Sequence, residues 1–221
     1  VLSLIFNDIK GVLLFEKMLT DNYDKPMDEI DDHAGNYGGV LIQPRRLMAS
    51  IISEFFVFLK VNSDILRDGE FNIIFNKMPK PYQSYWQQMV AVANGEKNEA
   101  SELIKSMTQI RSNITFHYDH SRKNLLKGYR SRFFGDVKDA KSEFAYYSVG
   151  DTVEATRFYF ADAAAEEAMY IMSGKDYGVS IKENEALTNY NVNFNETLEI
   201  INSVISSLIS CFIKYRRNHP R

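Results

Sequence analysis

Residues 96–118 read EKNEASELIKSMTQIRSNITFHY and form the most regular amphipathic pattern in the chain. Four apolar residues and one histidine recur there at alternating spacings of four and three, the period of one face of an α-helix. These residues are Leu103, Met107, Ile110, Ile114 and His117. The spacing predicts an amphipathic helix from Glu96 to about Tyr118 whose apolar stripe packs against other helices.

Similar patterns predict helices over most of the remaining chain. We expect them over residues 4–19, 46–61, 64–78, 82–93, 122–134, 152–173 and 195–217, with a short strand-like or irregular piece over 144–149. The segment Asp21–Gln43 is acidic, then rich in glycine, and ends at Pro44, so we predict a long loop there. The sequence therefore predicts an all-α fold, a helical bundle with additional helices and one long N-terminal loop, in a single domain over 1–221.

The composition limits the class of protein. The chain has 221 residues, 45% of them hydrophobic, which is enough for a sizeable core, and a net charge of −3. This charge argues against a surface that coats nucleic acid broadly, but it permits a local basic patch. The single cysteine, Cys211, cannot form an intramolecular disulfide, which fits a cytoplasmic protein.

Neither end of the chain predicts an association with membranes. Val1–Phe6 lacks the basic leader of a secretory signal. The apolar stretch Leu198–Ile213 contains Glu199 and is shorter than the run of about 20 apolar residues that a membrane span needs. We expect a buried helix with a basic C-terminal end and no membrane partner.

Arg111 and His117 suggest phosphodiester chemistry. An arginine can hold a phosphate through its planar fork of donors, and a histidine can take or give a proton near neutral pH. On a straight α-helix these two side chains lie about 120° apart and some 9 Å along the axis, so one helix face does not hold both. The simplest structural interpretation is a buried His117 and a surface Arg111.

The wider run, over residues 109–120, resembles the motif of the HEPN family (higher eukaryotes and prokaryotes nucleotide-binding), whose members are all-α. Arg111 is followed by the polar residues Ser112 and Asn113 and then, after a helical interval, by His117 and Tyr118. The commonest form of the motif has asparagine directly after the arginine. Here Ser112 comes first, so the role of the polar position is divided between Ser112 and Asn113.

The resemblance implies a metal-independent endoribonuclease that acts as a homodimer, in which the motifs of two subunits meet across a two-fold axis. Arg111 and His117 would be catalytic: Arg111 would stabilise the charge on the scissile phosphate, and His117 would act as general base or acid. Ser112, Asn113 and Tyr118 would support them. The products would be a 2′,3′-cyclic phosphate and a 5′-hydroxyl.

The family resemblance also implies partners and an alternative. Family members often serve in defence or toxin–antitoxin systems, so an antitoxin or a nucleotidyltransferase-like protein is a candidate partner. The alternative function is a non-catalytic HEPN-like module that binds a protein partner or a nucleotide, because the fold alone does not establish activity. A third interpretation is an unrelated helical domain in which the motif is accidental.

A basic run follows the motif directly. It contains the cations Arg122, Lys123, Lys127 and Arg130. The aromatic residues Tyr129, Phe133 and Phe134 lie among and after them. Cations combined with aromatic platforms suit single-stranded RNA. The structural alternative is a solvated amphipathic helix whose aromatic residues face the core.

Two groups of potential metal ligands are weaker candidates. They are the group His117, Asp119 and His120 and the acidic group Asp162, Glu166 and Glu167. Neither has the further Cys, His or Glu residues at the spacings that zinc or di-metal sites require. We therefore interpret both as solvated helix faces, and we expect no metal and no cofactor.

Overall fold

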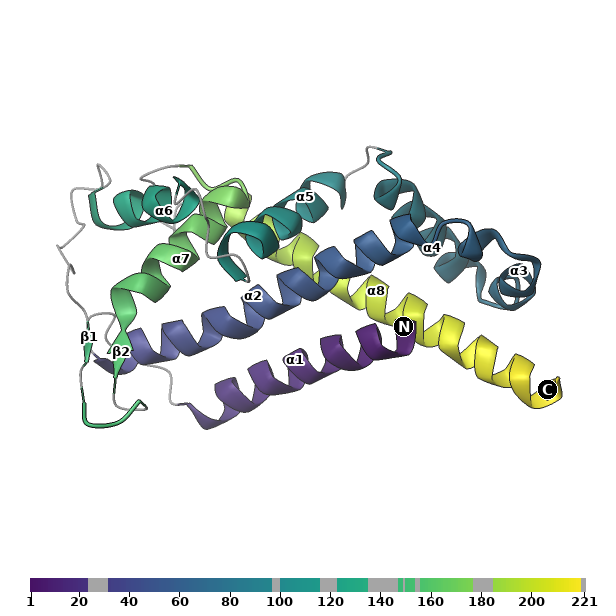
Figure 1. The fold of residues 1–221 in the computed structure, drawn as a ribbon, viewed down its shortest axis with the longest axis horizontal. Coiled ribbons are helices and arrows are strands. Elements are labelled where there is room, and N and C mark those ends of the chain that lie inside the picture. Colours follow the sequence, from purple (N-terminus) through teal and green to yellow (C-terminus); the bar gives the residue numbers. More distant parts are fainter. Residues whose placement is uncertain are drawn as a thin grey trace. The chain divides into compact units, whose positions relative to one another are not determined.

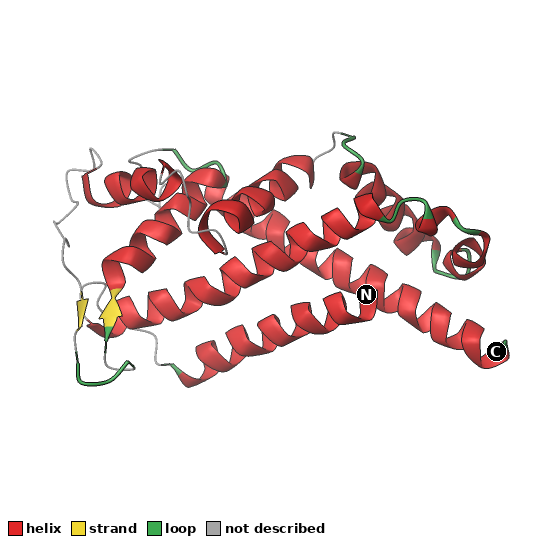
Figure 2. Cartoon of the chain, in the orientation of Figure 1, coloured by secondary structure: helices red, strands yellow, loops and turns green. Residues whose placement is uncertain are grey.

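The computed structural model describes residues 1–23, 32–96, 100–115, 123–134, 147–148, 150–153, 156–176 and 185–219. In these ranges the chain is almost entirely helical (Figure 1, Figure 2). Its helices are α1 (Leu2–Asn22), α2 (Asp32–Val61), α3 (Gly69–Phe75), α4 (Lys80–Ala93), α5 (Ala100–Ile110), α6 (Lys123–Phe134), α7 (Tyr159–Met172) and α8 (Glu185–Asn218). The strands β1 (Tyr147–Ser148) and β2 (Arg157–Phe158) form one antiparallel pair. The predicted all-α helical class is confirmed.

The predicted N-terminal loop is wrong at Asp21–Asn22, where α1 continues, and over its second half. Helix α2 begins at Asp32 and continues through Pro44, so residues 32–43 are helical, while residues 24–31 lie outside the described part. Gly39 is buried, and a Cβ atom there would overlap the Arg157 guanidinium. Because Gly39 has no side chain, the Arg157 guanidinium can approach the backbone of α2 closely. The glycines of this segment had favoured a loop in the sequence.

Three other helices begin well away from their predicted starts. Helix α3 begins later than expected, because the Asp68 side chain accepts a hydrogen bond from the Glu70 amide at 2.7 Å and caps the helix in place of Asp64. Helix α7 begins at Tyr159 because the two preceding residues pair with β1. Of the two alternatives for this segment, the strand-like one therefore holds at Tyr147–Ser148. Helix α8 begins at Glu185, earlier than predicted.

The chain divides into two compact units. Unit 1 comprises Val1–Gly11, Ile51–Lys105 and Val192–Arg221, and unit 2 comprises Val12–Ser50 and Ser106–Asn191. The core of unit 1 contains Phe55 and Leu59 from the end of α2 and Ile201 and Ile205 from α8. All four side chains are completely buried. The Phe71 ring packs against Phe75 and Trp86, with ring centroids 5.9 and 5.7 Å apart, and so joins α3 to α4.

In unit 2 the packing of α6 against α7 supports the candidate site. Helix α7 presents small buried residues, Ala164, Ala165 and Ala168, toward the core. A Cβ atom at Gly128 of α6 would overlap the Ala164 carbonyl oxygen. The two helices therefore approach closely at a position that only glycine tolerates, and this leaves the other face of α6 toward solvent.

Candidate functional site

Arg111 begins a π-helical turn. Helix α5 ends at Ile110, and the chain continues as a π-helix over Arg111–Thr115. The Thr115 hydroxyl oxygen lies 3.4 Å from the Ile110 carbonyl oxygen, five residues back. Because π-helical hydrogen bonds reach one residue farther than those of an α-helix, residues 111–115 depart from the straight α-helix that the sequence predicts. Turns of this kind occur frequently at functional sites.

The predicted apolar stripe is confirmed at its four described positions. Leu103, Met107, Ile110 and Ile114 are 7%, 1%, 1% and 2% exposed, respectively. Beside this stripe lie the first three motif residues, Arg111, Ser112 and Asn113, all half-buried. The predicted site residues His117, Tyr118 and Arg122 lie outside the described residues.

Arg46 of α2 holds the end of the π-helical turn. Its Nη2 atom donates to the Ile114 carbonyl oxygen at 2.5 Å. In return, the Thr115 hydroxyl donates to the Arg46 carbonyl oxygen at 3.2 Å. A cation at the carbonyl end of a helix is favourable because it meets the negative end of the helix dipole. These contacts therefore tie the turn that carries Arg111 to α2 within unit 2.

Asn113 makes a local contact. Its Nδ2 atom donates to the Gln109 carbonyl oxygen at 2.7 Å, four residues earlier. Side chains that bond back to their own helix in this way compete with regular helical hydrogen bonding. The side-chain amide nitrogen of Asn113 is thus engaged with the backbone, next to the half-buried Ser112.

The predicted basic run forms an exposed stripe on α6. Lys123, Lys127, Arg130 and Phe134 are all exposed, and their spacing of four, three and four places them on one helix face. We call these four residues the α6 stripe. Phe133, in contrast, is 7% exposed, against 58% for Phe134. The alternative of aromatic residues that face the core therefore holds for Phe133, while Phe134 remains accessible for stacking.

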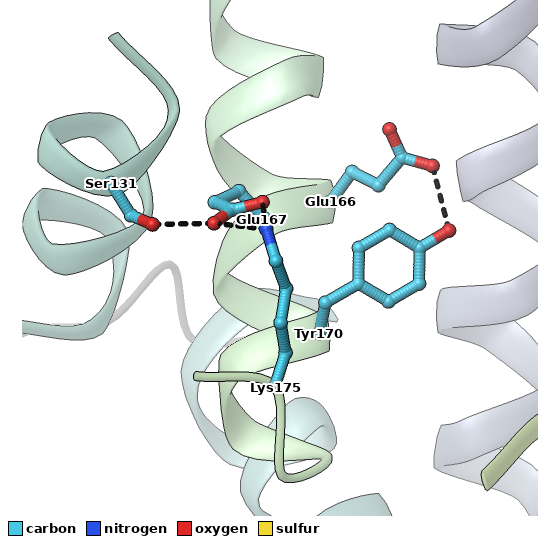
Figure 3. A network of polar contacts seen from close by, with 5 residues as sticks. All are labelled: Ser131, Glu166, Glu167, Tyr170 and Lys175. Carbon is cyan, nitrogen blue, oxygen red and sulfur yellow. Dashed lines mark hydrogen bonds and ion pairs between the residues drawn. The ribbon is translucent and has the colours of Figure 1, made fainter. Parts of the chain in front are cut away.

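A buried polar network lies behind the α6 stripe. The Ser131 hydroxyl donates to Glu167 at 2.5 Å, and Lys175 Nζ lies 2.6 Å from each Glu167 carboxylate oxygen. Figure 3 shows Ser131 of α6 and Lys175 meeting at this carboxylate of α7. The Lys175 and Glu167 side chains are 4% and 2% exposed. The prediction that Glu167 belongs to a solvated face is wrong, because this side chain is buried. A buried carboxylate needs a partner of opposite charge, and Lys175 provides it.

The other two members of the acidic group have different partners. Asp162 forms an ion pair with Arg157, with Nη2 and Oδ2 3.0 Å apart. Glu166 accepts a hydrogen bond from the Tyr170 hydroxyl at 3.0 Å (Figure 3), and Arg45 donates to that hydroxyl at 3.3 Å. Burial, together with the Glu166 carboxylate, raises the pKa of Tyr170 above its ordinary value.

The three carboxylates therefore do not converge on one point. Each of Asp162, Glu166 and Glu167 is directed to a different basic or hydroxyl group. Within the described ranges, no three acidic, histidine or cysteine side chains group closely enough to hold a metal ion.

Sequence reasoning missed Ser131, Lys175 and the two arginines of α2 as structural partners of this region. Ser131 and Glu167 belong to different helices, and no periodic pattern connects them. One signal was present: Glu167 falls in a run of small apolar residues that are buried in the structure, Ala164, Ala165 and Ala168. A charged residue on such a face requires a buried partner.

No protein-family model, no curated protein and no solved structure matches the chain. The functional assignment therefore depends on the residues and the geometry of unit 2.

Proposed function

We propose that the protein is a metal-independent endoribonuclease of HEPN type that cleaves single-stranded RNA as a homodimer. One observation carries the proposal: the motif residues Arg111, Ser112 and Asn113 start a π-helical turn whose last carbonyl groups are held by Arg46. An irregular turn costs stability unless other groups hold it, and such turns are kept preferentially where they orient functional groups.

In this proposal Arg111 binds the scissile phosphate and stabilises the negative charge that develops on its oxygens. His117 removes the proton from the 2′-hydroxyl, whose oxygen then attacks phosphorus. The bond to the 5′-oxygen breaks, and the second His117 of the dimer donates a proton to that oxygen. A cyclic 2′,3′-phosphate and a 5′-hydroxyl result, and the reaction uses no metal.

The α6 stripe supports the choice of single-stranded RNA. Lys123, Lys127 and Arg130 present three cations along one exposed helix face, and Phe134 continues this face with an exposed ring. The cations suit successive phosphates, and the ring suits an unpaired base. The stripe follows the motif in the sequence, and both belong to unit 2.

The test is cleavage of end-labelled single-stranded RNA in the presence of a metal chelator. We expect cleavage by the wild-type protein and losses of about 100-fold or more for Arg111→Ala and His117→Ala. His219→Ala is the matched control, because His219 is an exposed histidine on the other unit. The cleaved RNA should carry a cyclic phosphate.

Two outcomes would contradict the proposal. Equal cleavage by the wild type and both motif variants would identify a contaminating nuclease. Intact RNA in every sample, from a protein shown to be folded and dimeric, would favour the alternative of a non-catalytic module that binds a protein partner or a nucleotide.

A further inference from the structure

The apolar stripe of α8 continues beyond the residues that cover it. Ile201, Ile205 and Leu208 lie on this stripe at spacings of four and three, and they are 0%, 0% and 5% exposed. Phe212 is the next residue of the stripe and is 47% exposed, and the adjacent Ile213 is 45% exposed. The end of α8 therefore presents two large apolar side chains to solvent.

Three cations follow these two residues in the sequence. Lys214, Arg216 and Arg217 follow at once, and the sequence from Ile200 to Arg221 contains no aspartate or glutamate although the whole chain carries a net charge of −3. Arg216 and Arg217 lie one helical turn beyond Phe212 and Ile213, on the same side of the helix.

A further cation comes from outside α8. Lys77 follows α3 in unit 1, and its Nζ atom lies 5.1 Å from the centre of the Tyr215 ring. We call Lys77, Phe212, Ile213, Lys214, Arg216 and Arg217 the α8 patch. It combines exposed apolar side chains with cations from two parts of unit 1.

We propose that the α8 patch docks on the surface of an anionic lipid bilayer. Phe212 and Ile213 enter the boundary between headgroups and acyl chains, and the cations contact lipid phosphates. Apolar residues flanked by lysine and arginine on one helix are the arrangement that binds at this depth. This inference is independent of the proposed ribonuclease site and replaces the expectation of no membrane partner.

Charge favours this occupant over a second copy of the chain. A symmetric contact through the α8 patch would bring two sets of like charges together, which opposes association. An RNA phosphate backbone would satisfy the cations, but it offers no apolar layer for Ile213. An anionic bilayer satisfies both kinds of side chain at once.

The burial of α8 favours docking over spanning. The segment Phe194–Asn218 is long and apolar enough to cross a membrane by length and composition, and only 28% of its most apolar window is buried. However, Ile201, Val204 and Ile205 are completely buried in the core of unit 1. Insertion of the whole helix would remove them from that core, whereas surface docking uses residues that are already exposed.

The experiment is co-sedimentation of the full chain with vesicles of phosphatidylcholine alone or of phosphatidylcholine mixed with phosphatidylglycerol. We expect binding to the mixed vesicles, weak binding to the neutral ones, and a decrease in binding as salt is added. The double variant Arg216→Gln/Arg217→Gln should lower the partition constant about 25-fold, at about fivefold for each cation. The variant Phe212→Ser/Ile213→Ser should lower it about tenfold while the charge is unchanged.

Matched controls come from α2 in unit 1. Val57→Ser alters an apolar residue that is 46% exposed, and Lys60→Gln alters an exposed cation. Both should bind as the wild type does, and circular dichroism should show that all variants are folded. Equal binding to neutral and anionic vesicles, equal losses in the controls, or no vesicle binding would overturn the proposal. The proposal would also be overturned if the protein bound RNA through Arg216 and Arg217 but did not bind vesicles.

Discussion

Lys175 Nζ lies 2.6 Å from both carboxylate oxygens of Glu167, and the two side chains are 4% and 2% exposed. The pair stands directly behind Ser131, whose hydroxyl donates to the same carboxylate. Helix α6 therefore carries the α6 stripe on its exposed face, while Ser131 on its buried face contacts the ion pair. The packing that stabilises unit 2 therefore also holds the helix that carries the proposed RNA-binding surface.

Removing one charge of the pair should destabilise the protein strongly. Glu167→Gln leaves the Lys175 ammonium buried without a counter-charge, and we expect a loss of about 3–5 kcal/mol in the free energy of unfolding. Urea denaturation followed by circular dichroism measures it. The exposed pair Lys105–Glu102, with side chains 63% and 84% exposed, supplies the control, because Lys105→Ala should change stability by less than about 1 kcal/mol. Equal unfolding curves for Glu167→Gln and wild type would refute the structural role of the pair.

Two glycines of unit 2 should respond oppositely to alanine. At Gly128 a Cβ atom would overlap the backbone of α7, so Gly128→Ala should destabilise the protein by about 1–3 kcal/mol. At Gly38, also inside a helix, an added Cβ atom would meet nothing within 4 Å. Gly38→Ala should therefore stabilise the protein by about 0.5–1 kcal/mol, because alanine favours the helix. Thermal melts of both variants measure the difference, and a shift in the same direction would contradict the close packing of α6 on α7 at Gly128.

Arg46 should control the order of the π-helical turn. Arg46→Ala removes the donor to the Ile114 carbonyl oxygen, and we expect a loss of about 1.5–3 kcal/mol. Hydrogen exchange should accelerate over Arg111–Thr115 and remain unchanged over α4, which belongs to unit 1. Under the proposed function, RNA cleavage should fall in the same variant although Arg46 itself does not contact the substrate. Unaltered exchange over the turn would show that it forms without this contact.

Tyr170 should make the protein less stable at alkaline pH. Burial raises its pKa in the folded state above the ordinary value of 10.0, so the folded state holds the phenolic proton more tightly than the unfolded state does. The stability from this group is complete below the ordinary pKa and is lost as the pH rises through and above it. Denaturation at neutral and at alkaline pH should therefore show a larger decrease for wild type than for Tyr170→Phe. Parallel decreases would exclude this contribution.

The α6 stripe should bind RNA through its charge. Lys127→Gln/Arg130→Gln should weaken binding to single-stranded RNA and reduce the salt dependence, log K against log salt, by about 1.4, since each phosphate contact contributes about 0.7. Arg132→Gln is the matched control, because Arg132 is an exposed cation of α6 that lies outside the stripe. Fluorescence anisotropy at several salt concentrations measures both. A slope reduced by about 0.7 in Arg132→Gln, the same as for each stripe cation, would assign the binding to general charge and not to the stripe.

The sequence alone determined the features that depend on neighbouring residues. The spacing of Leu103, Met107, Ile110 and Ile114 predicted which helix face is buried, because helical periodicity and burial are coupled at short range. The end of α4 was likewise predicted from Asn94–Gly95, and Gly95 adopts the positive φ of 94° that favours glycine. The HEPN resemblance also came from one local run, and its catalytic assignment remains a proposal.

Only the tertiary structure decided the features that depend on partners distant in the chain. Residues 32–43 are helical although their composition favoured a loop. Within this helix Gly39 lies close to the side chains of Arg157 and Asp162. Glu167 is buried because Ser131 and Lys175 neutralise and solvate its charge. The turn at Arg111 is held by Arg46 of another helix. The physical reason is common to all three: the free energy comes from contacts between segments, which local propensity does not contain.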